Sequence, residues 1–211
     1  MKEVNSYGWK AVIGSSIGYA MDGFDLLILG FMLTLISGDL GLTTGQAGSL
    51  VTWTLVGAVI GGFIFGTLSD KFGRVRVLTW TIVLFAVFTG LCAFAQGYWD
   101  LLIYRTIAGI GLGGEFGIGM ALAAEAWPAQ HRAKATSYVA IGWQLGVLAA
   151  ALLTPVLLPY IGWRGMFMVG IIPAFVAWIF RAKLHEPEIF VQSKDTKEHS
   201  HTNSFKLLVK D

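Results

Sequence analysis

Six long apolar runs constrain this chain more than any other feature of its sequence. A helix needs about 18 or more mainly apolar residues to cross roughly 30 Å of hydrocarbon. Six stretches meet or approach that length, and the last of them is the shortest. They cover residues 11–36, 47–68, 77–94, 101–124, 138–158 and 165–180. The sequence therefore predicts an all-α, polytopic membrane protein with six transmembrane helices.

The composition agrees with this class and excludes several others. Hydrophobic residues make up 55% of the chain and charged residues only 13%, whereas soluble proteins carry about a quarter charged residues. Cys92 is the single cysteine, which excludes a disulfide scaffold, and we interpret it as a small apolar filler. The net charge of +2 gives no basic surface for a nucleic acid. The apolar runs hold no nucleophile and base pair and no Cys/His cluster, so we expect neither an enzyme nor a metal or cofactor site.

The positions of Lys and Arg predict the orientation. With the N-terminus in the cytoplasm, thirteen of the fifteen cations lie in cytoplasmic segments, and only Arg164 lies in a segment on the opposite side. Such a bias indicates that both ends face the cytoplasm. We accordingly expect a cytoplasmic N-terminus at residues 1–10, a transmembrane domain at 11–180, and a truncated cytoplasmic linker at 181–211.

Two acids stand in the middle of the first apolar run. Asp22 and Asp25 are three residues apart, so they share one face of a helix. Acids at such a depth more often serve ion or proton pathways than structure. The alternative is a pair of buried acids satisfied by the backbone and by hydroxyls such as those of Ser15 or Tyr19.

The fourth run carries Arg105 and Glu115. An arginine within a spanning helix usually faces a cavity or a counter-ion. At 1.5 Å per residue, Asp25 lies roughly 21 Å from the inner face and Arg105 roughly 6 Å from the outer face of a core about 30 Å thick. The two side chains are thus predicted at nearly the same level. Gln144 in the fifth run is a further candidate for contact with a ligand, although core packing is its simpler use.

Glycines at regular spacing mark the fourth run as a packing element. Small residues four apart let membrane helices approach closely. The glycines assigned to this role are Gly109, Gly111, Gly113, Gly114 and Gly117.

Two motifs resemble signatures of the major facilitator superfamily. The first is G-x-L-S-D-K-x-G-R with a further arginine, which is predicted to form the loop between the second and third runs. Its candidate functional residues are Gly66, Asp70, Lys71, Gly73, Arg74 and Arg76. The second is R-x-x-x-G-x-G-x-G-G, which begins at Arg105. Glu125 and Arg132 are predicted to join the cytoplasmic charges of the first motif.

Further strings are similar to the aromatic acid:proton symporters and the related sialate transporters. They are Asp22-Gly-Phe-Asp25, Gly-Glu115-Phe-Gly, Glu125-Ala-Trp-Pro and Gly-Trp163-Arg. This resemblance implies the N-terminal half of a superfamily transporter, built from two inverted three-helix repeats. It also implies a bacterial inner-membrane location and a missing C-terminal half, or a second copy, as partner.

The function that follows is proton-coupled import of an organic acid anion, most simply an aromatic carboxylate. Asp22 and Asp25 are expected to carry the proton, and Arg105, Glu115 and Gln144 to contact the substrate. Three alternatives remain open: a symporter for sialate or another sugar acid, a membrane subunit without transport of its own, and an inactive half-transporter.

Overall fold

The computed structural model describes residues 6–181, which form helices and short connections only. The elements are α1 (Ser6–Leu40), α2 (Thr44–Phe72), α3 (Arg74–Cys92), α4 (Tyr98–Glu125), a 3₁₀ turn η1 (Ala129–His131) and α5 (Arg132–Arg181). Each of the five α-helices includes a stretch long and apolar enough to cross a membrane. The all-α membrane fold predicted from the sequence is confirmed.

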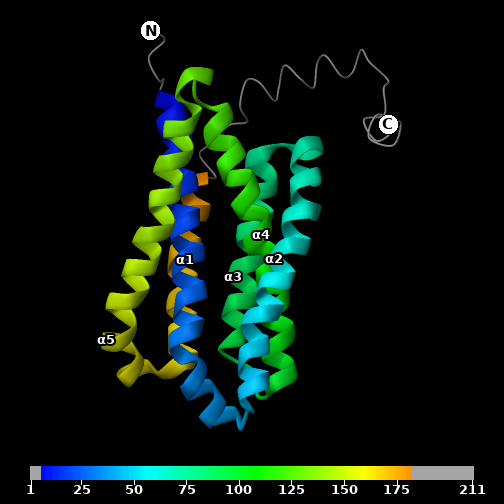
Figure 1. Cartoon of the computed structure of the whole chain (residues 1–211), viewed down its shortest axis with the longest axis vertical. Coiled ribbons are helices and arrows are strands. Elements are labelled where there is room, and N and C mark those ends of the chain that lie inside the picture. Colours follow the sequence, from blue (N-terminus) through cyan, green and yellow to red (C-terminus); the bar gives the residue numbers. More distant parts are fainter. Residues whose placement is uncertain (1–5, 182–211) are drawn as a thin grey trace.

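The fifth element, α5, contains two helical segments that meet at Gly162. Gly162 has φ 64° and ψ 179°, a conformation that only glycine adopts without strain. Figure 1 shows α5 running down along one side of the bundle and turning back at its lower end. The predicted spans 138–158 and 165–180 are therefore the two arms of α5. The loop expected between them is a sharp break in one element.

The first helix is longer than the sequence predicted. It begins at Ser6, so residues 6–10 are helical rather than part of an N-terminal tail. At its other end only residues 41–43 separate it from α2. Thr43 caps α2 with a capping box, in which Gln46 Oε1 accepts from the Thr43 amide at 2.9 Å. The residues predicted as a linker after Arg181 lie outside the described part of the chain.

The G-x-L-S-D-K-x-G-R motif is not the loop that its sequence suggested. α2 continues to Phe72 and α3 begins at Arg74, so Gly73 alone connects them. Gly73 has φ 109°, which a side chain would strain. The motif thus consists of two helix ends that meet at one glycine, and this holds its charged side chains on defined helical positions.

Glycines of α4 lie directly against the backbone of α2. A Cβ built at Gly109 would overlap the carbonyl oxygen of Thr54, and one at Gly113 would overlap that of Ala58. These pairs advance together along both chains, so α2 and α4 run in the same direction. A Cβ at Gly142 of α5 would likewise overlap a carbonyl oxygen of α1. A Cβ at Gly111 would meet the backbone of α3, and one at Gly114 would meet side chains of α3 and α2, so four of the five assigned packing glycines lie in close contacts.

Gly117 takes no part in the close contact between α2 and α4. No atom of the described chain lies within 4 Å of a Cβ built there, and Gly117 is exposed. On α2, Gly62 follows Thr54 and Ala58 at the same spacing, and a Cβ built there would lie 3.4 Å from the Gly113 carbonyl oxygen, which is an ordinary contact distance. The close backbone contact of the two helices therefore ends at Gly113, and the regular glycine spacing in the sequence overstates its length.

Candidate functional site

A buried ion pair joins α1 to α4 at the level predicted from helix depth. Arg105 Nη2 lies 2.7 Å from Asp25 Oδ2, and Arg105 Nη1 donates to Asp25 Oδ1 at 3.0 Å. Both side chains are fully buried within this six-helix unit. The paired N–H groups match the two carboxylate oxygens, which is the strongest geometry for such a pair. The predicted coincidence of level is confirmed.

Three further side chains surround the Arg105 guanidinium. Its Nε donates to Thr54 Oγ1 at 3.3 Å, and its Cζ lies 5.8 Å from the centroid of the Phe167 ring. Cys92, which the sequence suggested was only an apolar filler, is buried close enough to interact electrostatically with Arg105. Sequence reasoning missed these residues, and Thr54 is one of several hydroxyl residues in its apolar run, so the sequence did not single it out. The pair is thus enclosed by α1, α2, α3, α4 and α5.

A second buried group of acids lies along the same two helices. Asp22 and Glu115 have no exposed surface. The Tyr19 side chain is within electrostatic range of both carboxylates, and its hydroxyl donates to the Phe116 carbonyl at 2.7 Å. Its ring stacks on Phe116 with centroids 4.6 Å apart. The structure therefore separates the four predicted membrane acids and bases into an ion pair and a second acidic group.

Side chains from α5 border this second group. Trp143 meets the Phe116 ring edge-on at a centroid distance of 5.8 Å, and Phe116 is 45% exposed. Gln144, the other predicted contact residue, is exposed on α5 and forms no hydrogen bond within the described chain. An anion recognised by Gln144 would bind at the helix surface, whereas Glu115 lies inside the bundle.

The charged motif forms a network at the junction of α2 and α3. Arg74 lies 2.9 Å from Asp70 and 2.9 Å from Glu125, and its Nη1 donates to Ser69 Oγ at 2.7 Å. Glu125 at the end of α4 is thus the predicted partner of the motif. Lys71 and Arg76 are exposed, and so is Arg132 at the start of α5.

A second network ties the opposite ends of the helices together. Arg164 Nη1 lies 2.5 Å from Asp39 Oδ2, which also accepts from Trp163 Nε1 at 3.0 Å. Arg164 also donates to the Ala95 carbonyl. Asp39 lies beyond the apolar run 11–36, and the hydrogen bonds from Arg164 and then Trp163 lower the pKa of its carboxyl. The signal for this contact in the sequence is the pair of opposite charges at Asp39 and Arg164, in two segments predicted on the same side of the membrane.

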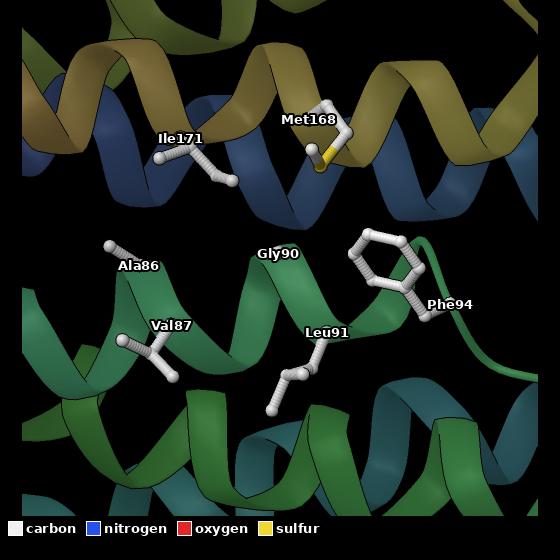
Figure 2. Close-up of a pocket in the computed structure, with 7 residues that line it drawn as sticks. All are labelled: Ala86, Val87, Gly90, Leu91, Phe94, Met168 and Ile171. Atoms are coloured by element: carbon white, nitrogen blue, oxygen red, sulfur yellow. The ribbon is translucent and has the colours of Figure 1, made fainter.

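An apolar groove lies between α3 and the second arm of α5. It encloses about 370 Å³, and Figure 2 shows side chains of both helices facing it. Its lining residues are Ala86, Val87, Gly90, Leu91, Phe94, Met168 and Ile171. None of them can bind a proton or pair with a carboxylate, so the groove is separate from the acidic site. Within the described residues, no group of three or more His, Cys, Asp and Glu is placed to hold a metal ion.

Comparison with known proteins identifies the family. The model of the major facilitator superfamily matches residues 15–211. The chain belongs to this superfamily. A solved superfamily member, the xylose transporter of Escherichia coli in a partially occluded inward-open conformation, superposes with a TM-score of 0.81 at 24% identity. That match covers 92% of this chain and 52% of the xylose transporter, and it supports the fold.

Curated superfamily relatives cover nearly the whole chain. A candidate metabolite transport protein of Haemophilus influenzae is 77% identical over 99% of this chain and 53% of its own length. A sialic acid transporter of Escherichia coli is 33% identical over 92% of this chain and 48% of its own length. A benzoate transport protein of Acinetobacter baylyi is 29% identical over 91% and 45%. The chain spans about half the length of the relatives it matches.

Proposed function

We propose that this chain is the N-terminal half of a proton-coupled symporter that imports an organic acid anion, with an aromatic carboxylate as the substrate. The observation that carries the proposal is the fully buried Asp25–Arg105 pair. Superfamily membership makes the protein a membrane transporter, and buried charge pairs in membrane helices commonly mark ion or proton pathways. The name of the benzoate relative supports the substrate class.

Coupling would follow from competition for Arg105. In the structure, Asp25 accepts one N–H from each terminal guanidinium nitrogen and neutralises the Arg105 charge, so a second carboxylate would bring an unbalanced negative charge into the site. A proton on Asp25 would remove its charge and weaken the pair, which would leave the guanidinium to a substrate carboxylate. Release of the substrate would restore the pair and expel the proton. In this scheme the substrate reaches the buried Arg105 only after Asp25 is protonated.

The remaining charges fit roles outside the coupling step. Asp22 is proposed as a second proton carrier, and Glu115 and Gln144 as substrate contacts at different depths. The Arg74 network and the cations around it would fix the junction of α2 and α3. The Lys and Arg bias supports a cytoplasmic location for that end, in the inner membrane of a bacterial cell. A sialate substrate is the second candidate, favoured by the sialic acid transporter among the relatives.

The test is uptake into proteoliposomes under an imposed pH gradient, acidic outside. Labelled benzoate and sialic acid would be offered to the 211-residue chain alone, and to the chain produced together with the C-terminal half of the Haemophilus relative. We expect benzoate accumulation in the second preparation, abolished by Asp25→Asn and retained by the matched outer variant Asp39→Asn. If only sialic acid accumulates, sialic acid replaces the aromatic carboxylate as the proposed substrate. If neither acid accumulates under the gradient, the proposal is contradicted.

A further inference from the structure

One face of α1 carries polar groups that the Asp25–Arg105 pair does not use. Ser15, Tyr19 and Asp22 follow one another at intervals of four and three residues, so they line the same side of the helix. All three are buried. The hydrogen bond from Tyr19 to the Phe116 carbonyl places this side against α4, next to the buried Glu115. A row of polar groups thus leads from the N-terminal part of α1 to two buried carboxyl groups.

The hydroxyl of Ser15 has an unusual position in this row. It has no exposed surface and no hydrogen-bond partner within the described residues. A serine inside a helix can satisfy its hydroxyl with the carbonyl oxygen four residues earlier. Ser37 does so in the same helix, where it donates to the Leu33 carbonyl at 2.7 Å. A buried hydroxyl without a partner is costly, and an internal water molecule is the usual remedy.

The residue opposite Ser15 leaves room for such a molecule. A Cβ built at Gly119 of α4 would lie 3.7 Å from Ser15 Oγ and 3.7 Å from Tyr19 Cε2. These are ordinary van der Waals distances, so a methyl group would fit there. Gly113, by contrast, must be glycine because the backbone of α2 occupies the position of its Cβ. Gly119 is therefore not required for helix packing, and it keeps a space of methyl size beside the unpartnered hydroxyl.

We propose that Ser15 and Gly119 hold a water molecule that carries protons to Asp22 and Glu115. The Ser15 hydroxyl can donate to the water, and the Tyr19 oxygen retains acceptor capacity beyond its bond to Phe116. A hydronium ion at this position would pass its proton along the row, past the Tyr19 hydroxyl, to one of the carboxylates and remain as water. Both carboxylates interact electrostatically with Tyr19, so their negative charges favour a positive ion in the space beside it. The inference rests on the proposed function, because it supplies a route for the coupling proton.

Infrared spectroscopy of the 211-residue chain in lipid nanodiscs tests this route without any transport. The carbonyl stretch of a protonated carboxyl shifts when its proton exchanges for deuterium, and exchange requires that water reaches the group. Asp22→Asn and Glu115→Gln would assign the bands at acidic pH. The decisive variant is Gly119→Ala, whose methyl group fills the space. The matched control is Gly170→Ala, whose Cβ would lie 3.5 Å from Thr89 Cγ2 and 3.6 Å from Ile28 Cδ1. Gly170 also borders a buried hydroxyl without a partner in the described chain, Thr89 Oγ1, so it tests whether filling any such space has the same effect.

We expect Gly119→Ala to slow the exchange of the assigned band by about tenfold, because one water-mediated hydrogen bond corresponds to roughly that factor. Gly170→Ala should exchange at the parent rate, and thermal unfolding should show both variants folded. Equal exchange in Gly119→Ala and the parent chain overturns the proposal. So does the lack of any band that Asp22→Asn or Glu115→Gln removes. Exchange needs no substrate, so a failed uptake experiment would leave this result interpretable.

Discussion

Asp25 and Arg105 are 80 positions apart in the sequence and meet through two hydrogen bonds of 3.0 and 2.7 Å. Neither side chain has any exposed surface. Each charge depends on the other, because a single buried charge without its partner is strongly destabilising. The pair therefore links the stability of the helical bundle to the protonation of one carboxyl group.

Removal of one partner should destabilise the protein more than removal of both. Asp25→Asn leaves the Arg105 charge buried, and we expect a loss of about 3–5 kcal/mol, the range for broken buried pairs. The double variant Asp25→Asn/Arg105→Gln should recover part of that loss. Thermal unfolding in detergent, followed by tryptophan fluorescence, measures both. A double variant less stable than Asp25→Asn alone would show that the pair is not the main interaction of Arg105.

The close backbone contact between α2 and α4 should tolerate no side chain at Gly113. Gly113→Ala places a methyl group on the Ala58 carbonyl oxygen, and we expect a loss of about 1–3 kcal/mol from overpacking. Gly117→Ala lies on the same helix in open space, and the better helix propensity of alanine should leave stability unchanged or raise it by about 0.5–1 kcal/mol. Equal losses for the two variants would contradict the end of the close backbone contact at Gly113.

The network at the junction of α2 and α3 should depend on Glu125. Glu125→Gln keeps the shape of the side chain and removes the charge that faces Arg74. Both groups are partly buried, so we expect a loss of about 1 kcal/mol, reduced at high salt. Thermal unfolding at low and high salt measures it. Arg132→Gln, which removes an exposed charge, is the control and should change stability by less.

The Asp39 carboxylate should stay charged at a lower pH than an ordinary aspartate does. Its pKa is lowered by hydrogen bonds from Arg164 and Trp163, so the charged form is stabilised in the folded protein. The contribution of this contact is fully present above the ordinary aspartate pKa and is lost as the pH falls through the lowered value. The indole N–H resonance of Trp163 reports the titration by NMR. A midpoint at or above the ordinary value would contradict the contact, and Asp39→Asn should abolish the transition.

The sequence alone determined the class of protein, the number of spans and the level of the ion pair. Apolar runs of sufficient length can only cross a bilayer as helices, and a fixed rise per residue places Asp25 and Arg105 at similar depth. The family motifs were also readable, because their residue spacing is local. Helix ends were less certain: the run of polar residues around Gly73 suggested a loop, whereas one glycine with φ 109° suffices for the turn.

Only the tertiary structure decided which residues face one another across helices. Thr54, Cys92 and Phe167 come from three different helices to surround Arg105, and no local pattern encodes that arrangement. The same limit explains Gly117, which has the spacing of a packing glycine but lies beyond the close backbone contact of α2 and α4. It also explains Gly119, where the glycine leaves space beside the Ser15 hydroxyl. Helix rotation and crossing set these contacts, and they depend on packing over the whole bundle rather than on the residues of one helix.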